Sequence, residues 1–217
     1  MLPLVPSEPL GRLSSSYSAA SGEGDGFARN VAYVPKDGPF PEFYEPVESP
    51  VANLLHPAVQ INPVLKYPRV KAKQPIGTAK DFPYVLMTST LAEHWCGGST
   101  TRNLPWLKEL VPEPMVELPT SLAAKLGIKY GDLVKVTSAR GELTVKAVVT
   151  RRMQSLRIAG QEVQVVWMPY NWGFKGLSNG PSVNVLTIDA ADPGAGTQES
   201  KACLVNVVPV GKAVASR

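Results

Sequence analysis

The sequence predicts a mainly β protein with short helices, arranged as a small barrel or curled sheet behind an extended proline-rich arm. Two observations carry this prediction. Twelve of the 21 prolines fall in residues 1–80, which contain no long apolar period, whereas residues 82–210 hold several short apolar runs separated by turn residues. Many short strands with frequent turns are typical of barrels. Residues 82–210 are also long enough to enclose one core.

Residues 1–80 are expected to form an arm without a core of its own. Residues 11–26 are mostly small and polar, which predicts disorder. Residues 31–75 alternate prolines with aromatic residues, which predicts an extended, polyproline-like strap anchored by its aromatic side chains. A strap of this length needs a surface to lie on, so we expect it to pack on a partner chain.

Local patterns predict the first elements of the barrel domain, which we place at residues 81–210, with a tail at 211–217. Residues 84–88 are β-prone, and the hydroxyls of residues 88–90 could cap a helix over 91–95 that stops at Gly97-Gly98. A strand is expected at 115–118. A helix is expected at 122–126, capped by Thr120 or Ser121 and ended by Gly127.

The strongest local signal is a hairpin. Residues 132–137 alternate as a half-buried strand does, residues 139–142 form a turn, and residues 143–149 return. Further strands are expected at 163–168, 185–188 and 203–208.

Composition excludes several classes of protein. The net charge of +4 comes from scattered Lys and Arg residues, whereas a nucleic-acid binder concentrates them on one face. A modest basic bias suits an anionic, phosphate-bearing cofactor. Two cysteines without paired spacing cannot build an iron–sulfur or zinc site alone. We expect no secretory signal at the start and no membrane span, because no run approaches the ~20 apolar residues required.

Residues 88–103 form the first candidate site. This stretch combines hydroxyls, two glycines, His94 and Arg102, and hydroxyls with free backbone N–H groups suit a phosphate or the edge of a pterin. The alternative is an ordinary polar loop that caps a helix. His94 and Cys96 are two residues apart and do not face each other on a helix, so we expect a packed histidine and a buried free thiol rather than a nucleophile and its base.

Two further segments could contribute to a site. Residues 167–174 are dense in aromatic side chains and include Asn171, which suits recognition of a flat heterocycle, although a hydrophobic plug of the barrel explains them equally. Asn184 offers a donor and an acceptor, and Lys201 offers a positive charge for a phosphate or a ring carbonyl. The alternative is a strand that ends in a turn, followed by a solvated lysine.

Taken in order, these segments resemble the C-terminal domain of the dimethyl-sulfoxide-reductase superfamily, which binds the molybdopterin guanine dinucleotide pair. The similarity rests on the hydroxyl-rich Thr88–Gly97 segment with Glu-His-Trp, Asn184-x-Leu-Thr, Asp192-Pro193, and Lys201 before a final strand. The finer resemblance is to respiratory formate dehydrogenase large subunits, and its motifs are residues 38–46, 53–57, 111–117, 138–142 and 172–174.

The resemblance implies a barrel of the double-psi type, with the strap packed against catalytic domains. It also implies a bis-molybdopterin guanine dinucleotide cofactor carrying molybdenum or tungsten. The cofactor-binding residues that it implies are Thr88, Ser89, Thr90, Leu91, Glu93, His94, Trp95, Cys96, Gly97, Asn171, Trp172, Asn184 and Lys201. This chain departs from many relatives, which carry an arginine at Thr90 and a histidine at Cys96 or Asn171. Loss of the arginine removes a fixed cation and a bidentate donor.

The family's metal-ligating residue and iron–sulfur cysteines have no counterpart in this sequence. We therefore expect no catalytic residue and no metal ligand here, and a formate dehydrogenase subunit that is inactive alone. Either the enzyme is encoded in two pieces, or this chain is a separated fragment. In the first case a separate catalytic chain would carry the metal ligand and an iron–sulfur cluster, with an iron–sulfur electron-transfer subunit beside it. The alternatives are the equivalent domain of a nitrate reductase and a cofactor-free barrel that serves as an assembly module. The compartment stays open between the periplasm, reached by co-export, and the cytoplasm.

Overall fold

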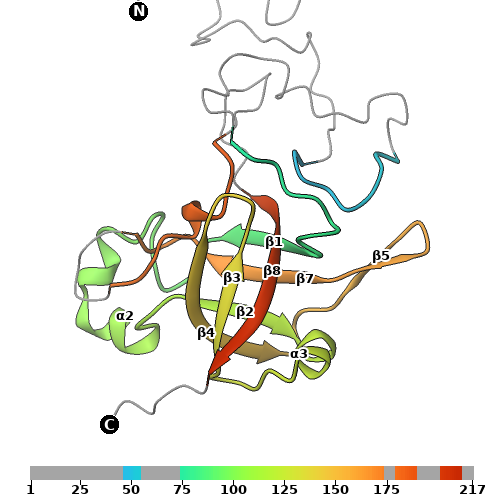
Figure 1. Cartoon of the computed structure of the whole chain (residues 1–217). Helices are drawn as coiled ribbons and strands as arrows, with labels where there is room; N and C mark the ends of the chain where they lie inside the picture. The colour runs from blue at the N-terminus through green and yellow to red at the C-terminus, as the bar shows by residue number, and fades with distance from the viewer. Residues whose placement is uncertain (1–45, 55–73, 174–178, 190–200, 212–217) are drawn as a thin grey trace, which may run out of the picture.

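The computed structural model describes residues 46–54, 74–173, 179–189 and 201–211. Within these ranges the chain forms short strands with a few short helices (Figure 1). None of these helices has the length and apolar character that crossing a membrane requires. In chain order the elements are β1 Tyr84–Ser89, the 3-10 turn η2 Thr101–Asn103, α2 Pro105–Leu110, β2 Met115–Pro119, α3 Thr120–Leu126, β3 Leu133–Thr137, β4 Glu142–Thr150, β5 Leu156–Ile158, β6 Gln161–Val163, β7 Val165–Pro169, the 3-10 turn η3 Val183–Val185, and β8 Ala202–Gly211.

Six strands close into a barrel in the order β1-β7-β2-β4-β3-β8. The pairs β1–β7 and β2–β4 are parallel, and the other pairs are antiparallel. Exchanging β1 with β4, β7 with β2 and β8 with β3 reproduces the same pairing pattern, so the barrel has an internal pseudo-two-fold. The predicted fold class, a mainly β barrel of the double-psi type with short helices, is confirmed.

The core lies inside this barrel because alternate side chains of each strand point inward. In β3, Val134 and Val136 are fully buried while their neighbours are only partly covered. Leu86 of β1 and Val166 of β7 are fully buried in the same cluster. Helix α3 contributes Leu122 to the same core. One continuous apolar core therefore holds both parallel pairs in place.

Several predicted elements are confirmed. The hairpin spans β3 and β4, and the strands expected at 84–88, 115–118 and 203–208 form as β1, β2 and β8. The expected run at 163–168 is divided between β6 and β7. Helix α3 ends where predicted, because Gly127 adopts a left-handed conformation with φ of 68° and its N–H bonds back to the last turn.

Other predictions were wrong. Residues 91–95 form turns rather than a helix, and Val185–Ile188 is not a strand because η3 occupies its start. Helix α3 has Pro119 at its N-cap and no side-chain cap, so neither Thr120 nor Ser121 plays that role. Helix α2 and the β5–β6 hairpin were not predicted. The first residue of α2 is a proline, which suits a helix start.

Two stretches of the predicted arm, residues 46–54 and 74–80, lie within the described part of the chain, and both contact the barrel itself. The Glu48 carboxylate accepts hydrogen bonds from the backbone N–H of Leu204 (2.7 Å) and of Gly77 (2.5 Å). Asp189 N–H donates to the Gln74 side chain (2.7 Å). For these stretches, the surface that the strap covers is this chain's own barrel. The rest of the arm lies outside the described residues.

Arg140, in the β3–β4 turn, completes this attachment, which we call the clasp (Glu48, Pro75, Gly77, Arg140 and Leu204). Its guanidinium pairs with Glu48 through Nη1 (2.5 Å) and Nη2 (3.0 Å). It also donates to the carbonyls of Pro75 and Leu186, both at 2.9 Å. Burial alone would raise the pKa of Glu48, but the hydrogen bonds from Arg140, Gly77 and Leu204 outweigh it and hold that pKa below its ordinary value.

Candidate functional site

The parallel pair β1–β7 creates the candidate site, because the carboxyl ends of parallel strands meet at the same edge. Ser89 ends β1 and pairs with Pro169 at the end of β7. The loops that follow, residues 90–100 and 170–173, therefore start side by side. Lys201 joins them, since its carbonyl accepts a hydrogen bond from Thr88 N–H at the start of β8 (3.0 Å).

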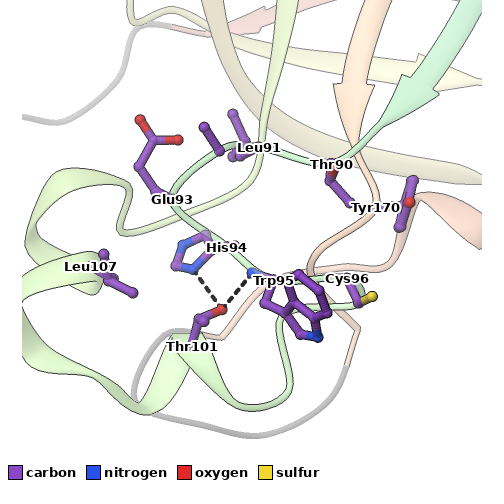
Figure 2. Close-up of a pocket in the computed structure, with 10 residues that line it drawn as sticks. Thr90, Leu91, Glu93, His94, Trp95, Cys96, Thr101, Leu107 and Tyr170 are labelled. Atoms are coloured by element: carbon purple, nitrogen blue, oxygen red, sulfur yellow. Dashed lines mark hydrogen bonds between the residues drawn. The ribbon is translucent and has the colours of Figure 1, made fainter.

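These loops enclose an open pocket of about 480 Å³ (Figure 2). Among its lining residues, Thr90 carries a hydroxyl, Glu93 a carboxylate and Tyr170 an aromatic ring. The ammonium of Lys201 lies 5.0 Å from the centre of the Tyr170 ring, a cation–π arrangement at the side of the pocket. The lining residues are Thr90, Leu91, Ala92, Glu93, His94, Trp95, Cys96, Thr101, Leu107 and Tyr170.

Asn171 holds the pocket loop in shape. Its side chain is fully buried, and its Oδ1 accepts from Leu91 N–H (3.0 Å). Its Nδ2 donates to the carbonyls of His94 (3.1 Å) and Cys96 (2.6 Å). These three bonds use both donors and one acceptor of the amide on backbone groups of residues 91–96. They hold this stretch in the turns that it forms.

His94 is a packed residue, as expected. Its Nε2 lies 3.2 Å from the Val111 carbonyl and its Nδ1 lies 3.3 Å from Thr101 Oγ1. A carbonyl can only accept, so Nε2 carries the proton and Nδ1 accepts from the Thr101 hydroxyl. That hydroxyl oxygen in turn accepts from Trp95 N–H (3.0 Å). The imidazole therefore connects the pocket loop to the chain that follows α2.

Trp172 packs behind His94. The two rings meet edge to face, with centroids 5.1 Å apart. The indole N–H of Trp172 is buried and has no hydrogen-bond acceptor among the residues that the structure describes.

The expected buried thiol at Cys96 was wrong, because Cys96 is exposed at the pocket rim. Its backbone has a φ of 47°, a left-handed value that is uncommon for a residue with a side chain. At Gly98 the backbone closely approaches another segment, because an added Cβ would lie 2.3 Å from the Asn171 carbonyl oxygen. Gly97 has open space around it. The tight turn thus depends on Gly98, which the set of candidate site residues omitted.

The remaining predicted residues are not in the pocket wall. Thr88 is buried in β1, and Ser89 Oγ accepts from the indole N–H of Trp167 (2.7 Å). Asn184 is exposed in η3, which follows Ser182, and Ser182 lies against Gly173. Ala92, Thr101, Leu107 and Tyr170 line the pocket but were not among the cofactor-binding residues that the resemblance implied. Tyr170 had a signal, since it sits inside the aromatic-rich segment, whereas Leu107 comes from the unpredicted α2.

Fold and site together define a six-stranded barrel with a polar and aromatic pocket beside the loops that follow one parallel pair. The comparison with protein families makes this specific. Residues 84–204, more than half of the chain, match the molydopterin dinucleotide binding domain. The chain belongs to this family.

Relatives of known name place the domain within large redox enzymes. The chain is 43% identical over 185 residues to formate dehydrogenase 2 subunit alpha (cytochrome c-553) of Nitratidesulfovibrio vulgaris, covering 84% of this chain and 18% of the relative. It is 42% identical over 173 residues to the nitrate-inducible formate dehydrogenase major subunit of Escherichia coli, covering 79% and 17%. The chain thus spans less than a fifth of the length of these relatives.

A solved structure supports the fold. Acetylene hydratase from Pelobacter acetylenicus superposes with a TM-score of 0.53 at 17% sequence identity, covering 82% of this chain and 22% of that one. At this identity the likeness concerns the fold alone.

Proposed function

We propose that this chain binds the bis-molybdopterin guanine dinucleotide cofactor of a formate dehydrogenase and completes the active site of a separate catalytic chain. One observation carries the proposal: segments that are far apart in a family-matched sequence converge on one pocket. Residues 90–96 come from the end of β1, Tyr170 from the end of β7, and Lys201 from the start of β8.

The residues present fit such a cofactor chemically. A pyrophosphate needs a cation, and Lys201 presents one at the side of the pocket. A pterin or guanine is a flat ring with amino and carbonyl edges, which suits the face of Tyr170, the Glu93 carboxylate and the Thr90 hydroxyl. The buried indole N–H of Trp172 is a further donor that has no acceptor in the described part of the chain.

Within this proposal the chain's own residues bind and orient. Thr88 to Gly97, Asn184 and Lys201 hold the cofactor, and Trp172 helps to form the site. Asn171 acts through the backbone of residues 91–96, which it fixes. When bound, the cofactor supplies the molybdenum or tungsten at which formate and carbon dioxide are interconverted by two-electron chemistry. Positioning that centre is this chain's contribution, and the chain alone is inactive.

The partner in this proposal is a catalytic chain with the metal-ligating residue and an iron–sulfur cluster, joined by an iron–sulfur electron-transfer subunit. The relatives support a role beside such a chain, because they are formate dehydrogenase large subunits of which this chain covers 17–18% of the length.

The test is to purify the native complex through a tag on this chain and to measure molybdenum, tungsten, guanine dinucleotide and formate oxidation. We expect one metal, the dinucleotide and activity together. A complex that contains neither metal nor pterin would instead favour a cofactor-free assembly module.

Site residues can be tested in the same complex. Asn184→Ala combined with Lys201→Ala should lower bound pterin, because the pair removes an amide and a cation. Lys129→Ala, which removes an exposed charge from another part of the surface, is the control and should leave pterin content unchanged. Full pterin occupancy in the double variant would contradict the assignment.

A further inference from the structure

Four large apolar side chains are exposed at the rim of the pocket or near it, and the core explains none of them. Trp95 is 72% exposed, Leu104 50%, Trp106 83% and Leu110 68%. Single exposed apolar residues are ordinary, but a group of large ones marks an interaction surface. We call these four residues the apolar patch.

The patch is continuous with the pocket rim. Trp95 and Leu107 line the same pocket, and Leu107 belongs to α2. Trp106 and Leu110 are four residues apart on α2, so they share one face of that helix. Leu104 is the N-cap of α2. In Figure 1, α2 lies outside the barrel wall on the side toward which β1 and β7 point.

Helix α2 contributes no buried residue to this chain. A six-residue helix gains little from backbone propensity alone and normally depends on packing of its apolar face. Here the two large residues Trp106 and Leu110 face outward instead. The exposed apolar face of α2 is therefore suited to packing against a surface that the described residues do not provide.

We propose that the apolar patch is the surface on which the cofactor-bearing remainder of the large subunit docks, next to the mouth of the pocket. This inference rests on the proposed function. Two observations select that occupant. The relatives are single chains in which residues like these occupy 17–18% of the length, so this domain has evolved against the other four-fifths. The patch also borders the opening of the pocket, where a cofactor shared between two chains must be enclosed.

The experiment uses the tagged complex from its own host. Trp106→Glu and Leu110→Glu should each lower recovery of the pterin-bearing chain roughly tenfold or more, as expected for a charge placed in the centre of an interface. Trp106→Phe should retain the chain, because it keeps an aromatic anchor. Tyr130→Glu is the matched control: Tyr130 is 74% exposed in the loop after α3, and this change should have no effect. Circular dichroism of each purified chain checks that the barrel is intact.

Hydroxyl-radical footprinting of Trp95 and Trp106 identifies what covers the patch. We expect protection in the complex and none in the isolated chain. Protection in the dilute isolated chain would assign the patch to this chain's own residues outside the described ranges. Protection that grows with concentration of the isolated chain would assign it to a second copy. Either result overturns the docking proposal.

The two proposals can fail separately. If Trp106→Glu leaves a complex that still holds pterin, the patch is not the docking surface and the cofactor role stands. If the wild-type complex holds no pterin, the cofactor role fails and the patch proposal fails with it.

Discussion

The clasp and the pocket loop both attach distant segments to the barrel, but they do so with different chemistry. In the clasp, Glu48 and Arg140 are charged, buried and bonded to each other as well as to backbone groups. In the pocket loop, the buried, neutral amide of Asn171 bonds to the backbone of residues 91–96, while the side chains of Trp95 and Cys96 are exposed. The clasp is complete within this chain. The pocket loop is fixed on its inner side and presents its outer side to other molecules.

The difference teaches where stability and binding reside. A buried ion pair tolerates no loss of a partner, since the remaining charge is left without compensation. A loop held by neutral hydrogen bonds can lose one of them at lower cost, and its exposed groups contribute little to folding. Changes in the clasp should therefore affect stability most, and changes in the loop should affect ligands and reagents most.

The largest expected effect follows from Arg140→Ala. It leaves the Glu48 carboxylate buried with two backbone donors and no counter-charge, which should lower the free energy of unfolding by about 3–5 kcal/mol. Urea denaturation of the isolated chain measures it. Lys135→Ala is the matched control, because its ion pair with Glu142 is exposed and worth about 1 kcal/mol or less. Equal losses in the two variants would show that the clasp is no stronger than a surface pair.

A smaller effect is expected from Asn171→Ala, which removes three hydrogen bonds and should cost about 1–3 kcal/mol. Hydrogen exchange at Leu91 N–H should rise sharply, because that amide loses its acceptor. Asn171→Asp should be at least as harmful, since a carboxylate oxygen would face the carbonyls of His94 and Cys96.

The control for Asn171 is Asn103→Ala, which removes an exposed amide bonded to Ser99. It should leave both stability and Leu91 exchange near wild type. Unchanged exchange at Leu91 in Asn171→Ala would mean that the amide does not hold the loop.

The pocket loop and the clasp also show which features could not be predicted from the sequence. Local alternation and Gly127 were enough to predict the β3–β4 hairpin and the end of α3, because neighbouring residues determine both. The helix predicted at 91–95 does not form, and the turns found there are bonded to Asn171, 80 residues away from Leu91, which no local pattern indicates. The clasp joins residues 92 positions apart, and no periodicity in either segment indicates the pairing.

The candidate site, like the fold, was predicted only in part. The resemblance selected the stretch that forms the pocket loop, and Thr90 to Cys96 do line the pocket. Tyr170 and Leu107 were missed because their contributions depend on how β7 and α2 are placed, which is a property of the closed barrel. Cys96 was expected to be buried because free cysteines usually are. Its left-handed backbone turns it outward instead.

A third effect depends on pH. The folded-state pKa of Glu48 lies below its unfolded value, so the clasp stabilises fully above the unfolded pKa near 4.5 and loses that contribution as pH falls through the lower folded pKa. Thermal melts between pH 7 and pH 3 should show an acid-dependent loss that is smaller in Glu48→Gln, which carries no titrating group there. If the melting temperatures of wild type and Glu48→Gln fall in parallel as pH is lowered, Glu48 is not the cause of the acid-dependent loss.

The smallest expected effect concerns the reactivity of the two cysteines, one near the clasp and one at the pocket, and does not require a change in stability. Burial, together with the negative charge of Glu48, raises the pKa of Cys203 to about 12, so almost none of this thiol is ionised near neutral pH. Cys96 is exposed at the pocket rim. Iodoacetamide at pH 8 should therefore label Cys96 in the folded chain and reach Cys203 only in urea. Mass spectrometry of tryptic peptides distinguishes the two sites.

Arg140→Ala should speed labelling of Cys203 without changing that of Cys96, because it opens the clasp and leaves the pocket loop intact. Equal labelling of both cysteines in the folded wild type would mean that the clasp opens readily, and the contrast between the two regions would then fail.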